Sequence, residues 1–546
     1  MNNQPDSISN APIQNGHTVT PLFERKGFDM IAALVLIVLS ICGVSAVFWN
    51  GLGLGYTLVF FVTTVFISAA VIKKNVKFSL SFWLCGILSL ICAASFFVSS
   101  NTAVKVFTLL ATSLSAMVFF TNISGKEYTP GDYYLAVYFF NTVIKAAGSI
   151  PAIFKSFIVK REGKSKTASH ILIGAAAALP AVLIIVPLLA NADEAFYTLV
   201  TKVFTGFYTL VQKVIIGVFL SVILLAVTFY LKYSKDAYGS KELKVSVNNA
   251  SACTFLCVLC FVYLVYLFSQ LAYFFSAFSS MLPKGYKFTY AQYARRGFFE
   301  LCAISVINLI VIFIAILFSK KKNGKITLAV KLPSAFIVLF TFIIIFTAIS
   351  KMVMYIGAYG CTILRVCTSA FMIWIFAVFV CVLIRLFKKR FDILKAGLIF
   401  ALIILAVLGL GNVNARIAEY NYSAYKSGKL EIDVKYMGEL GYEGIPYLYE
   451  LTKDEDTEKS DIAKEELSKA YVRYYRIMWS DLKEIDSYKA FLKYKNAQEN
   501  IGSYSIPKSK AYEILDKYAK EQDGVVYYGS QDKETYLFPT DYYTWY

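Results

Sequence analysis

Apolar windows of about 20 residues, the length that a bilayer core requires, recur eleven times along this chain of 546 residues. They begin near Met30, Leu54, Phe78, Val104, Ile171, Val214, Ala250, Phe298, Phe336, Thr362 and Leu394. With 58% apolar and only 16% charged residues, the chain is too apolar for a soluble globular protein of this length. The sequence therefore predicts an all-α polytopic membrane protein with about 11 transmembrane helices, whose first partner is the lipid bilayer.

The net charge of +18 is divided unevenly along the chain. Up to residue 411 there are 35 Lys and Arg against 12 Asp and Glu, whereas the remainder has 19 against 24. Because the basic excess belongs to the membrane part, we expect no nucleic-acid partner. Alternate connecting segments hold 26 of those 35 basic residues, which makes their side cytoplasmic. With the amino terminus on that side and an odd number of spans, the carboxyl-terminal part is extracytoplasmic.

These patterns predict five segments. The polar residues 1–29 are expected to be a flexible cytoplasmic arm and not a signal peptide. Residues 30–120 form four transmembrane helices, 121–169 a cytoplasmic loop with an interfacial helix, 170–411 a seven-helix transmembrane core, and 412–546 a small, mostly helical extracytoplasmic domain.

Two apolar stretches are not counted among the eleven spans. The interfacial helix is expected at 133–159, where Lys145, Pro151 and Lys155 interrupt an apolar run. The stretch 195–211 carries aromatic residues at nearly helical spacing and is expected to lie on the outer surface. A crossing by just one of these two stretches would change the side of the carboxyl-terminal part.

The carboxyl-terminal part shows helical periodicity at 463–479, 488–499 and 508–521. In the first of these stretches, Leu467, Tyr471, Tyr474 and Met478 recur at helical spacing and form one apolar stripe. None of the ten cysteines lies after residue 411, so this domain is expected to depend on an apolar core and not on disulfides.

The segment T-Y-A-Q-Y-A-R-R-G-F-F-E-L at 289–301 carries charge into the edge of a predicted span. On a helix, Tyr293, Arg296 and Glu300 share one stripe, and Arg296 and Glu300 are spaced to pair. One interpretation is a polar site that faces a cavity, since charge inside a membrane is costly. The other is a structural clamp in which Tyr and Arg anchor the helix at the interface.

A second polar segment, S-K-M-V-M-Y-I-G-A-Y-G-C-T-I-L-R at 350–365, surrounds the predicted outer turn between two spans. Arg365 falls inside the predicted span and needs a partner. The candidate outer polar site comprises Asp193, Glu194, Tyr293, Arg295, Arg296, Glu300, Lys351, Tyr355, Tyr359 and Arg365. These residues form either one outward-facing pocket or separate structural pairs and snorkelling side chains.

These two segments, together with N-A-R-I-A-E-Y-N at 414–421 and the following G-K-L-E-I-D, resemble the bacterial membrane-protein family called domain of unknown function 4173 and its broader relative 4153. The resemblance covers roughly 133–451. It implies an integral protein of the bacterial cell membrane whose activity is unassigned.

We expect neither a cofactor nor a metal. The only histidines are His17 and His170, and Cys253, Cys257 and Cys260 lack a joining His or carboxylate, which favours small packing residues. Three functional classes remain. The favoured one is a cell-envelope or signalling component that binds an envelope protein, a cell-wall component or a lipid through residues 412–546. The alternatives are a carrier or channel for a small solute and a membrane-embedded transferase acting on a lipid-linked substrate, with Asp193 or Glu194 as its base or metal ligand.

Because Leu467 and its stripe supply a core to bury, a purified fragment of residues 412–546 should be soluble and helical. We expect its circular dichroism to show a cooperative thermal transition. A transition without cooperativity would mean that these helices need the spans or the membrane surface.

Overall fold

The computed structural model describes residues 27–48, 52–72, 80–125, 134–158, 185, 193–233, 247–279, 298–320, 326–388, 391–480 and 504–521. Across these residues the regular elements are helices, accompanied by one isolated β-bridge between Val247 and Ser319. Nine of the described helices are long and apolar enough to cross a bilayer. The described part of the chain thus has the architecture of a helical membrane protein.

Ten helices coincide with predicted windows. They are α1 (Gly27–Phe48), α2 (Leu54–Val71), α3 (Leu80–Val98), α4 (Thr102–Ile123), α7 (Glu194–Tyr233), α8 (Asn249–Ser279), α10 (Phe298–Phe318), α11 (Leu328–Tyr359), α12 (Ile363–Phe387) and α13 (Ile393–Leu410). All except α3, whose apolar stretch Phe82–Val98 is shorter, belong to the nine candidate spans. The window near Ile171 lies outside the described residues, so the count of eleven stays a prediction.

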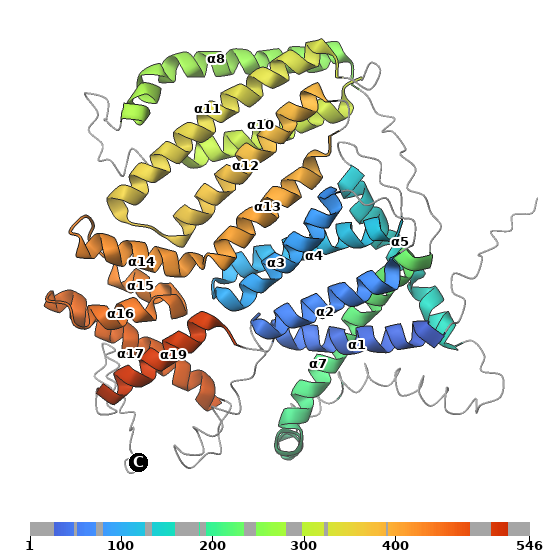
Figure 1. Cartoon of the computed structure of the whole chain (residues 1–546), viewed down its shortest axis with the longest axis vertical. Coiled ribbons are helices and arrows are strands. Elements are labelled where there is room, and N and C mark those ends of the chain that lie inside the picture. Colours follow the sequence, from blue (N-terminus) through green and yellow to red (C-terminus); the bar gives the residue numbers. More distant parts are fainter. Residues whose placement is uncertain are drawn as a thin grey trace, which may run out of the picture.

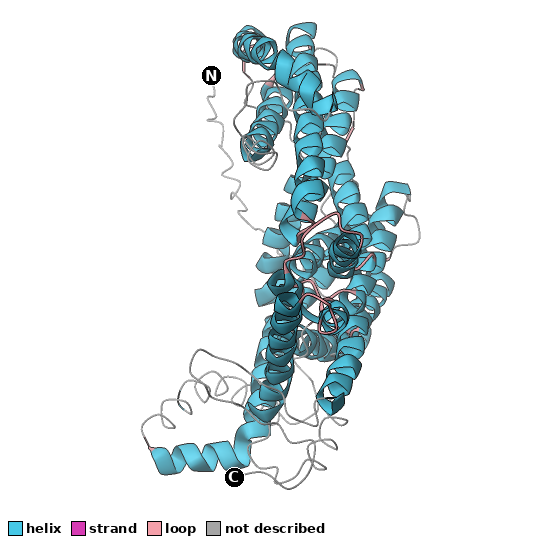
Figure 2. Ribbon diagram, turned by 90° about the vertical axis from the view of Figure 1, so that its left-hand side faces the viewer, coloured by secondary structure: helices cyan, strands magenta, loops and turns pink. Residues whose placement is uncertain are grey.

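Most of these helices lie side by side in one slab (Figure 1), which Figure 2 shows from its narrower side. The α3–α4 turn, the α11–α12 turn and the end of α13 all meet the C-terminal helices, and we call this the docked end. The α12–α13 connection lies at the opposite end, since α12 leads away from the docked end and α13 returns to it.

The C-terminal helices are α14 (Val413–Lys426), α15 (Val434–Glu439), α16 (Ile445–Leu451), α17 (Thr457–Ser480) and α19 (Ile506–Glu521), with a 3₁₀ turn η1 (Gly441–Glu443). Helices α17 and α19 match two predicted helices, and the predicted helix at 488–499 lies outside the described residues. Leu467 of the predicted stripe is fully buried, whereas the side chains of Tyr471, Tyr474 and Met478 lie outside the description.

The core of these helices continues into the bundle. Met437, Leu448 and Leu467 are buried in one cluster with Val104 at the start of α4. Partly buried residues at the ends of the spans, among them Ile363, pack against the same cluster. The independence of residues 412–546 stays a prediction, because part of this core belongs to the spans.

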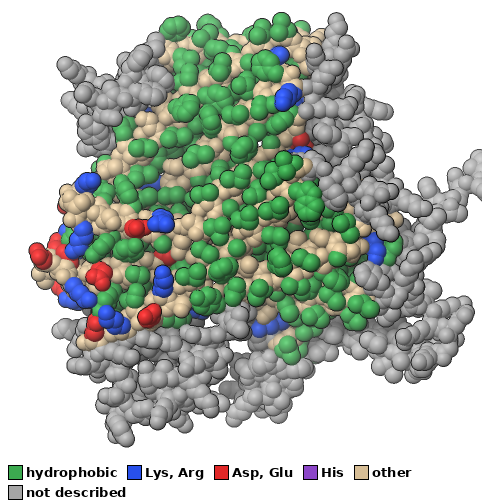
Figure 3. All heavy atoms as spheres, viewed as in Figure 1, with side chains coloured by type: hydrophobic (Ala, Val, Ile, Leu, Met, Phe, Trp, Pro, Cys, Tyr) green, Lys and Arg blue, Asp and Glu red, His purple; other side chains and the backbone are tan. Residues whose placement is uncertain are grey.

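The visible face of the bundle is apolar over most of its area, whereas Lys, Arg, Asp and Glu gather over the C-terminal helices (Figure 3). Large apolar side chains such as Phe219, Phe261 and Phe268 are exposed. A continuous apolar face of this kind is suited to lipid and not to water.

Helix α5 (Tyr134–Ile158) contains Pro151, packs mainly on α7, and is not among the nine candidate spans. The stretch 195–211, expected to be a separate surface helix, is instead the first half of the 40-residue helix α7. The first turns of α7 run in a different direction from the remainder of the helix (Figures 1 and 2). Their position relative to a membrane surface stays a prediction.

Candidate functional site

The residues of the predicted polar site are only partly described. Tyr293, Arg295 and Arg296 lie outside the described residues, as does the side chain of Glu194. Asp193 is exposed just before α7, and Glu300 is exposed in the first turn of α10.

Arg365 finds its partners on the preceding helix. Its Nη1 donates to the carbonyl oxygens of Tyr359, at 2.9 Å, and Gly360. Its guanidinium carbon lies 4.1 Å from the centre of the Tyr355 ring. The last carbonyls of α11 lack partners within the helix, and a cation at a helix C-terminus is favourable. The described partners of Arg365 are thus two backbone carbonyls and an aromatic ring.

The fold brings predicted site residues together in two separate groups. The charges of Lys351 and Glu300 interact between α11 and α10. Tyr355, Tyr359 and Arg365 form the second group at the end of α11, where the two tyrosine ring centres are 5.5 Å apart. One outward-facing pocket that contains all ten predicted residues stays a prediction.

The α11–α12 turn is held by the C-terminal helices. Asn421 of α14 accepts from the backbone N–H of Cys361 at 2.7 Å and donates to the Cys361 carbonyl at 2.8 Å. Gly360 has a φ of +75°, and a Cβ there would lie 2.8 Å from Oδ1 of Asn421, so this position requires glycine. The backbone N–H of Ile363 donates to the Tyr436 hydroxyl at 2.7 Å.

The α3–α4 turn makes a second contact through two buried asparagines. Nδ2 of Asn101 donates to Oδ1 of Asn414 at 2.8 Å, and Nδ2 of Asn414 donates to the Leu440 carbonyl at 3.0 Å. Oδ1 of Asn101 also caps α4 by accepting from the backbone N–H of Val104 at 2.8 Å. One amide therefore both begins α4 and binds α14.

The buried carboxylate of Glu443 lies beside the asparagines, and this residue is only 4% exposed. The backbone N–H of Ser100 donates to its Oε1 at 2.8 Å, and the Ser100 hydroxyl donates to its Oε2. Lys105, 8% exposed, donates to the Leu52 carbonyl at 2.8 Å, and its charge interacts with Glu443. A buried anion persists only where hydrogen bonds and a counter-charge compensate its lost hydration.

These two contacts form what we call the docking interface. Its bundle side is Ser100, Asn101, Lys105 and the 360–363 turn, and its C-terminal side is Asn414, Asn421, Tyr436 and Glu443. Buried hydrogen bonds of this kind make the contact between the two sides rigid. Among the described residues, no group of three or more His, Cys, Asp or Glu could hold a metal.

Sequence reasoning missed most of this interface. The sequence marks Asn414 and Asn421 only as members of the motif at 414–421, and Glu443 belongs to none of the motifs described above. The one available signal was the polar turn S-S-N at 99–101 followed by Lys105 at the start of a span.

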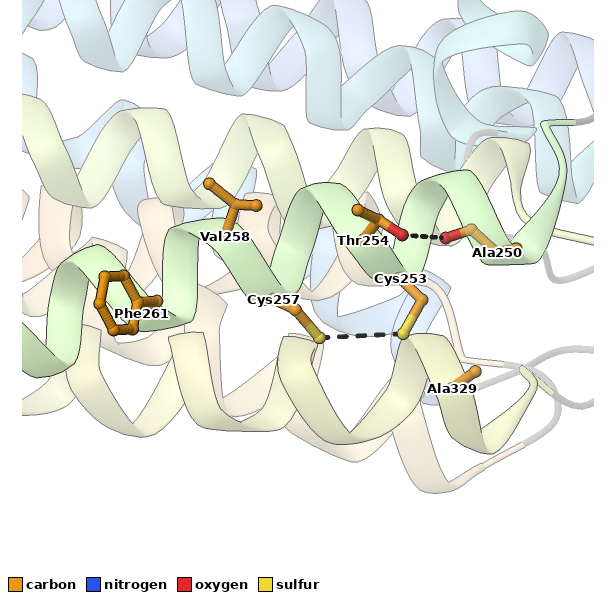
Figure 4. Close-up of a pocket in the computed structure, with 7 residues that line it drawn as sticks. All are labelled: Ala250, Cys253, Thr254, Cys257, Val258, Phe261 and Ala329. Atoms are coloured by element: carbon orange, nitrogen blue, oxygen red, sulfur yellow. Dashed lines mark hydrogen bonds between the residues drawn. The ribbon is translucent and has the colours of Figure 1, made fainter.

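An open groove of about 620 Å³ lies along α8 beside the start of α11 (Figure 4). It is lined by Ala250, Cys253, Thr254, Cys257, Val258, Phe261 and Ala329. The Cys253 and Cys257 sulfurs are 3.9 Å apart, and Cys260 donates to the Pro333 carbonyl at 3.6 Å. Cys257 is exposed in this groove rather than packed between helices.

The chain matches the family described as Domain of unknown function (DUF4153) over residues 85–451, about two thirds of its length. It belongs to this family. A search of the curated proteins and of the solved structures finds no match. The DUF4153 region begins within α3 and ends with α16, so it includes both sides of the docking interface, from Ser100 to Glu443.

Replacing Glu443 by Gln should destabilise the docked C-terminal helices. The change removes the negative charge near Lys105 and turns one acceptor oxygen into a donor that faces the Ser100 donors. Losing hydrogen bonds to a buried charge costs on the order of 2 to 3 kcal/mol, which should lower the thermal midpoint of the detergent-solubilised protein by a few degrees. Glu439→Gln, at an exposed glutamate nearby, is the control. Equal midpoints for the two variants would show that the Glu443 carboxylate contributes little.

Proposed function

We propose that this DUF4153 protein is a bacterial cell-envelope or signalling component in which the C-terminal helices act as a binding module. The observation that carries this proposal is the docking interface. Buried hydrogen bonds at two separate turns hold the module in one orientation on the spans. A module that is fixed in this way can present a constant surface to a partner. Because the contact is rigid, binding of a partner can also affect α3, α11 and α12.

The module is proposed to lie on the extracytoplasmic side of the plasma membrane, with a cytoplasmic amino terminus. Basic residues near the opposite end of the bundle support this orientation, because cytoplasmic connections carry the excess of Lys and Arg. In the described part of α10–α13 they are Lys320, Lys331, Arg385, Lys388 and Lys395.

The chain organisation proposed with this function is a cytoplasmic arm at 1–29, four spans at 30–120, a cytoplasmic loop at 121–169, a seven-helix core at 170–411 and the module at 412–546. The motif resemblance further supports a place close to the related family 4173. The outward-facing polar site is proposed to include Glu300, Lys351 and Arg365.

The exposed surface of the module supports recognition of a polar partner. Along α14, the Arg416 and Glu419 side chains pair at 2.9 Å while 74% and 53% exposed. Tyr420 is exposed beside them. Exposed aromatic and arginine side chains on a rigid helix are typical of binding surfaces, and the partner classes we propose are an envelope protein, a cell-wall component or a lipid.

Orientation is tested with single cysteines in a cysteine-free background. Cysteine at Asp461, which is well exposed on α17, should react with a membrane-impermeant thiol reagent in intact cells. Cysteine at Asn323, between α10 and α11, should react only after the cells are broken. Reaction at Asn323 in intact cells would reverse the orientation and remove the basis for an extracytoplasmic module.

Partner binding is tested from the same position. A cysteine-directed photo-crosslinker at position 461 should yield a defined conjugate with an envelope protein, or carry the chain into the detergent-insoluble cell wall, and a crosslinker at position 323 should do neither. A conjugate that contains only lipid-linked sugar would favour the transferase instead.

A further inference from the structure

Asp392 is a buried carboxylate at the opposite end of the bundle from the docking interface. The residue is 6% exposed and directly precedes α13, outside the candidate span Ile393–Leu410. Its Oδ1 accepts from the backbone N–H of Lys395 at 3.0 Å and so caps the helix. No hydrogen-bond donor among the described residues reaches its Oδ2. A buried oxygen in this state calls for an explanation, because such groups are nearly always satisfied.

Ionisable groups on α13 itself and on its neighbours α3 and α12 surround this end of α13. On α13 itself, the charge of Lys395 interacts with Asp392, and its ammonium lies 4.5 Å from the centre of the Phe82 ring. On α3, the fully buried Cys85 thiol interacts electrostatically with Asp392 and Lys395.

The remaining neighbours are α12, α4 and α5, and on α5 the exposed Lys145 is the charged side chain that the structure describes. Arg385 in the last turn of α12 is buried and donates to the Lys388 carbonyl at 3.0 Å. Cys381 lies one turn before it and is also buried. Helix α4 has no ionisable side chain after Lys105, and its Ser115 hydroxyl donates to the Cys85 carbonyl. Asp392 is therefore the one carboxylate among the groups named here.

We propose that Asp392 is a proton-binding site of the membrane bundle, loaded from the end opposite the C-terminal helices. A proton from solvent forms an O–H bond at Oδ2, the carboxylate charge disappears, and no other bond changes. Oδ1 keeps its bond to the Lys395 N–H, so helix α13 stays capped in both states. The proposal does not depend on the function proposed for the C-terminal module.

Burial raises the pKa of Asp392 to about 6, against the opposing effects of the Lys395 and Leu394 N–H groups and of the Lys395 ammonium. Because this pKa lies above the ordinary value of 3.8, the folded protein binds the proton more tightly than the unfolded chain does. The resulting stability is fully present below pH 3.8 and is lost as pH rises through about 6. An isosteric residue that is always neutral should abolish this dependence.

The test uses the full-length protein in nanodiscs and the variant Asp392→Asn, which keeps a capping oxygen and has no charge. The variant should unfold at a higher temperature than the native protein at a pH of about 8, and the difference should shrink as pH falls through about 6. Asp433→Asn is the matched control, because Asp433 also caps a helix, α15, but is exposed. The control should leave the pH profile of the native protein unchanged.

Infrared spectroscopy measures the same proton directly. The native protein should gain a protonated-carboxyl band with a midpoint near pH 6, and Asp392→Asn should lack it. Lys395→Met should move the midpoint to higher pH, because the ammonium favours the carboxylate form. If Asp392→Asn does not fold, the proposal is tested by the protonated-carboxyl band of the native protein and by the shift of its midpoint in Lys395→Met. A band retained in Asp392→Asn, or a midpoint that Lys395→Met does not raise, would overturn the proposal.

Discussion

The buried contact between Glu443 and Ser100 is the interaction on which the placement of the C-terminal helices depends most. A carboxylate that is withdrawn from water needs donors in fixed positions, and the Ser100 backbone and hydroxyl provide two of them. Ser100 lies in a short turn whose geometry is set by α3 and by the Asn101 cap of α4. Because the same turn reaches Asn414, its two polar contacts restrict both translation and rotation of the C-terminal helices.

Close packing between α3 and α13 sets the position of the α3–α4 turn. A Cβ at Gly409 would lie 2.4 Å from the Ser95 Cβ, so only glycine permits this approach. Further along the pair, the Cys92 thiol donates to the Leu402 carbonyl at 3.1 Å. Helix α14 follows α13 after two residues, Gly411 and Asn412, and Asn412 has a φ of +47°. The rigid connection between the spans and the C-terminal helices is therefore helix α13, which runs from Asp392 towards Asn414.

Apolar windows predicted most of the bundle, because a bilayer imposes length and composition on every span. The apolar window near Phe336 begins eight residues after the first residue of α11, because Lys331 and Pro333 resemble a loop. Pro333 is the sixth residue of α11 and lies inside the helix, as membrane helices allow, and the Lys331 ammonium lies 4.0 Å from the centre of the Phe387 ring. The partners of Arg365 were not predictable, because backbone carbonyls are present at every position. Glu443 escaped notice because its partner lies 343 residues earlier in the chain.

That separation along the chain has a consequence for biogenesis. A ribosome completes α3 and α4 long before it reaches Glu443, so the nascent bundle carries a polar turn whose final partners do not yet exist. Until they arrive, water must satisfy Ser100 and Asn101, which keeps this end of the early bundle open to solvent. Closure of the α3–α4 turn is thus among the last steps of assembly, and a truncated chain would display the unfilled turn to the proteases that remove incomplete membrane proteins.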